Sequence, residues 1–143
     1  MYKFLGDTLV QKKHFENAKN IDLPIEKQRV LVVYNEPLTD AISLMIENMM
    51  KACKLQEPDY LIVNIKKYPF QWKNIATQVE LIKEVILFGD LEDALNLNFN
   101  FKINYPTMFD QRVWIKAHPL NEIYQNDKVK GAFWSQALQP YFT

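Results

Sequence analysis

Three polar residues that follow apolar runs are the strongest candidates for chemistry. His118 and Pro119 come directly after the run RVWIKA (112–117), and Asn35 and Glu36 come directly after RVLVVY (29–34). A histidine in such a place can stabilise an anion that develops as a bond breaks, and an amide or carboxylate can orient a water molecule. If both runs are parallel strands of one sheet, their carboxyl ends lie at the same edge, where ligands bind in open α/β sheets.

The same residues also have a structural interpretation, which we favour. The loop after the first run, YNEPL (34–38), contains no glycine, whereas a site that receives a flipped nucleotide needs close backbone approach. Pro119 lacks an N–H and fixes φ, which explains a turn after a strand without any chemistry. We therefore predict no catalytic residue. A set made of His118 with Asn35 or Glu36 remains the alternative.

Strands and helices alternate along the chain. Continuous apolar runs predict buried strands, and apolar spacings of three or four predict helices. The predicted strands are 29–34, 60–65, 84–88 and 112–117, and the predicted helices are 40–53, 74–82 and one that starts at Asn126 or Asp127 and ends before Pro140. Residues 96–104 are expected to form an irregular edge hairpin. This pattern predicts an α/β fold, a three-layer sandwich with a mostly parallel four-stranded sheet and helices on both faces.

The chain is predicted to have an N-terminal arm, 1–27, and a single α/β domain, 28–143. The arm carries Phe4, Leu5, Leu9 and Val10 without a clean strand alternation. Such an apolar segment either packs on the domain or docks on a partner as a short segment that orders on binding. The residues alone leave these two alternatives open.

Charge and composition exclude several classes of function. The chain has 17 Lys and Arg against 17 Asp and Glu, so a strong direct grip on nucleic acid is not expected. Cys53 is the only cysteine, which rules out an internal disulfide and fits a reducing, cytoplasmic compartment. No apolar run is long enough for a membrane span or a signal peptide. With two histidines and one cysteine far apart in sequence, no metal and no cofactor is predicted.

Two sets of apolar residues can be interpreted either as core residues or as part of a binding surface. Met45, Met49 and Met50 lie on one predicted helix face together with Cys53, and we predict core packing, with an adaptable partner surface as the alternative. The aromatic residues that follow the predicted strands 60–65 and 84–88 could stack on bases, but no basic groove accompanies them, so a core or protein-contact role is favoured. This second set is Phe70, Trp72, Phe99, Phe101 and Tyr105.

The last part of the chain resembles a known family. The segment KAHPLNEIYQNDKVKGAFWSQALQPYF, together with VILFGD and the first run, is similar to the psi subunit of bacterial DNA polymerase III. The residues that carry this resemblance in the tail are Pro119, Leu120, Asn126, Lys130, Ala132, Phe133, Trp134 and Gln136. The resemblance implies a uracil-DNA-glycosylase-like fold that has no glycosylase activity. It also implies a non-enzymatic accessory role, as a bridge between the clamp-loader ATPase and the chi subunit, which leads on to single-strand-binding protein.

The arm takes part in the resemblance. Leu5-Gly6-Asp7-Thr8 matches a Leu-Gly-x-Thr segment that precedes the domain in the psi family, where the arm inserts into the collar of the clamp loader. This implies that Phe4, Leu5, Leu9 and Val10 contact clamp-loader subunits. Two alternatives to the psi-like role are a divergent uracil-type DNA glycosylase and a glycosylase-like shell reused for an unrelated protein contact.

Overall fold

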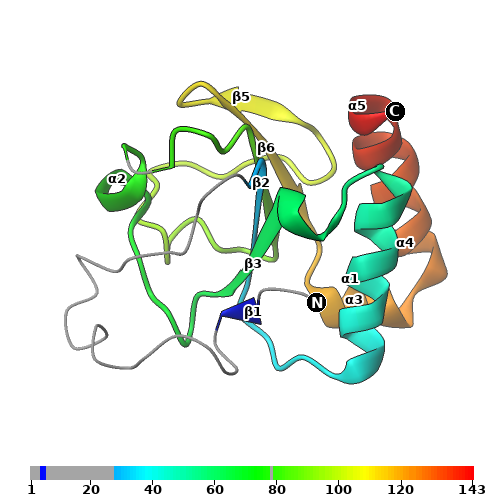
Figure 1. Ribbon diagram of the computed structural model, residues 1–143. Helices are drawn as coiled ribbons and strands as arrows, with labels where there is room; N and C mark the ends of the chain where they lie inside the picture. Colours follow the sequence, from blue (N-terminus) through cyan, green and yellow to red (C-terminus); the bar gives the residue numbers. More distant parts are fainter. Residues whose placement is uncertain (1–3, 6–27, 78) are drawn as a thin grey trace.

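A computed structural model describes residues 4–5, 28–77 and 79–143, and it is built on one mixed sheet (Figure 1). The sheet has six strands in the order β1-β3-β2-β4-β6-β5, and all neighbours are parallel except β5 and β6. The strands are β1 Phe4–Leu5, β2 Val30–Tyr34, β3 Tyr60–Asn64, β4 Glu84–Phe88, β5 Thr107–Phe109 and β6 Arg112–Ala117. The predicted α/β class with a mostly parallel sheet is confirmed.

The prediction of four strands was too low, because a strand is added at each edge. β1 has two residues and β5 has three, so neither is long enough to give a hydrophobic pattern in the sequence. β5 is joined to β6 by Asp110 and Gln111, which both have positive φ, 51° and 64°. That is the backbone of a tight two-residue hairpin, which is usually signalled by Asn-Gly or Asp-Gly. The predicted hairpin at 96–104 was therefore wrong, and the edge hairpin lies further along the chain.

Helices cover one face of the sheet. They are α1 Asp40–Ala52, α3 Leu120–Gln125, α4 Asp127–Phe133 and α5 Gln139–Phe142, and a π-helical turn, Trp134–Leu138, joins α4 to α5 (Figure 1). Thr39 begins α1 by accepting a hydrogen bond from the Ile42 N–H at 3.1 Å. Ile46 and Met50, fully buried, pack with the β2 residues on the same face, as the apolar spacing predicted.

The opposite face is covered mostly by loops, so the third layer of the predicted sandwich is irregular. Its only helix among the described residues is α2, Trp72–Ile75, and the predicted helix 74–82 was wrong. The buried Arg112 binds this segment instead. Its guanidinium donates hydrogen bonds to the carbonyl oxygens of Ala76, Val79 and Ile82, at 2.9, 3.1 and 3.2 Å. Val79 also accepts from the Ile82 N–H at 3.0 Å, so this segment is held as turns by backbone and Arg112 donors together.

The C-terminal helices run past the expected stop. Asn126 begins α4, since its side-chain oxygen accepts from the N–H groups of Lys128 and Val129, which confirms one of the two predicted caps. The prediction that Pro140 ends the helix was wrong. In the π turn the Gln139 N–H donates to the Trp134 carbonyl, and Pro140 then falls in the first turn of α5, where a missing N–H costs little.

A buried carboxylate holds the end of this helical layer to the sheet. Glu84, at the start of β4, accepts two hydrogen bonds from Arg29, at 2.7 and 2.8 Å, and one from the Tyr141 hydroxyl at 2.6 Å. Burial, and next the bond to Glu84, raise the pKa of Tyr141 to about 12. The position of α5 is thus fixed by a polar contact as well as by packing.

Candidate functional site

The carboxyl edge of the sheet gathers the residues that the sequence singled out. β3 and β4 lie on opposite sides of β2, so the direction of chain crossover reverses at β2, which is where open α/β sheets usually bind ligands. Asn35 and Glu36 follow β2, Asp90 follows β4, and His118 follows β6. The predicted convergence of these strand ends is therefore present.

Glu36 is occupied by a structural role. Its carboxylate accepts hydrogen bonds from the N–H groups of Leu120 and Asn121, at 2.5 and 3.0 Å. A carboxylate at a helix N-terminus satisfies orphan N–H groups and lies at the positive end of the helix dipole. Glu36 thus caps α3 from a loop 84 residues earlier in the sequence, and it ties the β2 loop to the segment after His118.

His118 and Glu36 do not form an ion pair with each other. The His118 Nδ1 lies 3.4 Å from a carboxylate oxygen of Glu122, one helical turn later, and about a third of its side chain is exposed. Pro119 packs beside the end of β4, where Gly89 has a φ of +114° and an added Cβ would lie 3.8 Å from the Pro119 ring. Only glycine adopts that conformation readily. The predicted His118-Pro119 turn after the strand is confirmed.

Asn35 lines an open pocket of mixed polar and apolar lining at the ends of β2 and β3. The pocket has a volume of about 320 Å³ and is also lined by Glu36, Pro37, Asn64 and Lys66 among others. Asn64 is held in place, since its side-chain oxygen accepts from the Lys66 N–H at 3.0 Å. Asn35 shares this pocket with Glu36, whose two carboxylate oxygens are both engaged with α3.

A buried lysine that no local sequence pattern singles out, Lys116, holds the neighbouring part of the edge. The Lys116 Nζ lies 2.7 Å from Asp90 and 3.0 Å from Glu92, and Lys116 and Glu92 are only 5% and 1% exposed. Burial alone would lower the pKa of Lys116, but the two carboxylates outweigh it and the pKa is raised. Hydrogen bonding to Lys116 lowers the pKa of Asp90. Glu92 also accepts from the Phe101 N–H at 2.8 Å, so it anchors the long loop before β5.

Cys53 and most of the candidate aromatics belong to the core. Burial raises the pKa of the Cys53 thiol to about 11, which makes it a poor nucleophile and confirms the core interpretation. Phe70, Trp72 and Phe101 are buried as well, and Phe101 stacks on Trp114 with ring centroids 5.1 Å apart. Within residues 28–77 and 79–143 no three His, Cys, Asp or Glu side chains gather in a way that could hold a metal ion.

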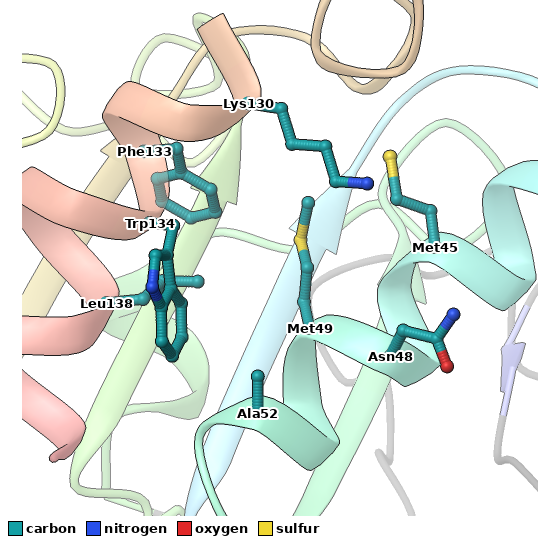
Figure 2. A pocket seen from close by; sticks show the side chains of 8 residues that line it. All are labelled: Met45, Asn48, Met49, Ala52, Lys130, Phe133, Trp134 and Leu138. Atoms are coloured by element: carbon teal, nitrogen blue, oxygen red, sulfur yellow. The ribbon is translucent and has the colours of Figure 1, made fainter. Parts of the chain in front are cut away.

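A second, apolar pocket opens on the helical face (Figure 2). It lies between α1 on one side and α4 with the π turn on the other, and its volume is about 170 Å³. Its lining residues are Met45, Asn48, Met49, Ala52, Lys130, Phe133, Trp134 and Leu138. Figure 2 shows Lys130 reaching across from α4 toward Met45, so an ammonium group borders an otherwise apolar hollow. Met45, Met49 and Met50 are all buried in the core, as predicted, and Met45 and Met49 also border this opening.

The predicted partner-binding arm is described only at two residues. Phe4 and Leu5 form β1, whose backbone pairs with Ile62 and Val63 of β3. Leu9 and Val10 lie outside the described residues. The sheet edge at β3 is therefore covered by the very segment that was predicted to dock elsewhere.

Comparison with known proteins does not assign this chain to a family. No protein-family model matches the chain, and neither does any curated protein. In the described part of the chain, each helix falls short of the length and apolar character needed to cross a membrane.

Proposed function

We propose that this chain is a non-enzymatic, psi-like accessory subunit of a bacterial replicative DNA polymerase. In this role the N-terminal arm contacts the clamp-loader ATPase subunits, and the domain offers a surface to a second protein, chi, which connects to single-strand-binding protein. The observation that carries the proposal is the makeup of the apolar pocket. Lys130, Phe133 and Trp134, three of the tail residues that resemble the psi family, all line it.

We also infer the uracil-DNA-glycosylase-like fold that the resemblance implies. The parallel order β3-β2-β4-β6 and the His-Pro turn after the last parallel strand support this assignment. The non-enzymatic role is supported by Glu36, because a carboxylate that caps α3 through both oxygens is poorly placed to orient a water molecule.

Size-exclusion chromatography with the clamp-loader ATPase assembly of the same organism tests the role. We expect the full chain to co-elute with the assembly. The variant Leu9→Asp/Val10→Asp should elute alone, because a buried apolar contact does not tolerate unpaired carboxylates. This variant leaves the β1 residues Phe4 and Leu5 unchanged, so it is sharper than a deletion of 1–15. Independent elution of the full chain would contradict the proposal.

A uracil-release assay on uracil-containing DNA separates the alternatives. The proposal predicts no release by the full chain. Release that is lost in His118→Ala would instead identify a divergent glycosylase. If the chain neither releases uracil nor binds the clamp loader, the fold is a shell used for another protein contact.

A further inference from the structure

The pocket on the helical face has room for one aromatic ring. Its volume is about 170 Å³, and apolar cavities of about 150 Å³ bind benzene in proteins. Two walls are methionine side chains, Met45 and Met49, whose flexible thioethers adapt to an incoming group and make favourable contacts with ring edges. The opposite wall holds Phe133 and Trp134. Size and lining together favour a ring over a polar ligand.

Lys130 adds a charge requirement at this pocket. Its side chain is exposed and has no hydrogen bond or ion pair with any residue that the structure describes. In Figure 2 its ammonium group lies over the Met45 and Met49 end of the pocket. An unpaired ammonium at the rim of an apolar pocket is complementary to a carboxylate that arrives beside an apolar anchor. A ligand with a positive charge at the same place would be repelled.

The backbone at this wall departs from the regular α-helix. Trp134–Leu138 form a π-helical turn, and both end residues of that turn line the pocket. Single π turns within α-helices occur frequently at functional sites, since the extra residue per turn redirects side chains. The local conformation is therefore an independent indication that this part of the helix is more than a cover for the sheet.

We propose that this pocket anchors an aromatic side chain from a partner protein, with an aspartate or glutamate of the same partner beside it on Lys130. The inference rests on the proposed function only in taking the occupant to be a partner protein. Nucleic acid is disfavoured because Lys130 is the one cation among the lining residues, whereas phosphate backbones require several.

The test uses two small probes and the isolated full chain, so it does not depend on clamp-loader binding. The chain carries ¹³C-labelled methionine methyl groups and is titrated with 3-phenylpropanoate, a ring with a carboxylate, and with 2-phenylethylammonium, a ring with an amine. We expect 3-phenylpropanoate to shift the Met45 and Met49 methyl signals and to bind about threefold more tightly than the amine, as for an exposed ion pair. The Met108 methyl, 70% exposed and outside the pocket, serves as the internal reference.

Matched charge reversals complete the experiment. Lys130→Glu should invert the preference and Lys130→Met should abolish it. Lys128→Glu, two residues away on α4 and outside the lining, should leave the preference unchanged. The proposal would be overturned if both probes bound equally well, or if Lys128→Glu changed the preference as much as Lys130→Glu does. Shifts confined to methyl groups other than those of Met45 and Met49 would also overturn it. The absence of any methyl shift would also overturn it, because the pocket would then be closed to the probes. A concentration-dependent dimer that Lys130→Glu abolishes would overturn it too, because a second copy of the chain would then occupy the pocket.

Discussion

The carboxyl edge of the sheet and the pocket on the helical face use charge in opposite ways. At the edge, Glu36 and Lys116 are tied to other parts of the chain, to two N–H groups of α3 and to Asp90 and Glu92. At the pocket, Lys130 has no partner among the described residues and lies beside apolar side chains. The comparison teaches that a cluster of charges at the expected place in an α/β fold can be part of the scaffold. An unpaired charge at the rim of an apolar pocket is the better indication of a contact surface.

Replacing Lys116 is expected to have the largest effect on stability. Lys116→Met leaves the Glu92 carboxylate buried without its cation, and we expect the free energy of unfolding to fall by about 3–5 kcal/mol in urea denaturation. The double variant Lys116→Met/Glu92→Gln should lose less than the single variant, because no buried charge is then left unpaired. Lys83→Met, at an exposed lysine, is the control. A loss below about 1 kcal/mol would show that this pair does not support the edge.

Replacing Glu36 tests the structural role of the second edge charge. Glu36→Gln keeps one accepting oxygen and removes the charge at the start of α3, so the free energy of unfolding should fall by about 1–2 kcal/mol. Glu80→Gln, at an exposed glutamate, should change it by less than about 0.5 kcal/mol. If Glu36→Gln left the free energy of unfolding unchanged, the capping role would be contradicted and the carboxylate would be available for another function.

Acid should weaken the edge through Asp90. Its pKa is lowered in the folded chain, so its contribution to stability is present above the ordinary value of 3.8 and is lost as the pH falls through the lowered pKa. The stability difference between the wild-type chain and Asp90→Asn should therefore be largest at neutral pH and should shrink below about pH 4. Urea denaturation at several pH values measures this difference. For the control Asp93→Asn, at an exposed aspartate, the stability difference from the wild-type chain should not shrink in this way as the pH falls.

The smallest effect is expected at the pocket. Lys130→Met should change the free energy of unfolding by less than about 0.5 kcal/mol, the same as Lys128→Met, because neither side chain has a partner among the described residues. Thermal or urea denaturation checks both. A loss above about 1 kcal/mol for Lys130→Met alone would place Lys130 in the scaffold and would remove the contrast between the two regions.

The sequence predicted the elements whose causes are local. The four long strands follow from continuous apolar runs, and α1 from the apolar spacing within residues 40–53. The contacts that decide the rest connect distant residues. Arg112 looked like an ordinary strand residue, yet its guanidinium binds the carbonyl oxygens of Val79 and Ile82, some 30 positions earlier. Lys116 was likewise included in a strand pattern, and nothing local marks it as the partner of Asp90 and Glu92.

The candidate site was likewise predicted only in part. The convergence of Asn35, Glu36 and His118 follows from parallel strand direction and was foreseen. The capping of α3 by Glu36 was not, because α3 is six residues long and gives little periodicity of its own. The helical pocket was partly foreseen in the Met-rich face of α1. Its other wall depends on a π turn, which the spacing of apolar residues does not reveal.

The pairing of β1 with β3 sets up a competition. Any partner that uses the Phe4 and Leu5 backbone groups now paired with Ile62 and Val63 must first displace that pairing, so the measured affinity is reduced by its free energy. Release also leaves β3 as an unpaired edge, which is a template for association with other chains. Weakening the β1–β3 pairing would thus tighten partner binding and, in the same step, raise the tendency of the unbound chain to aggregate.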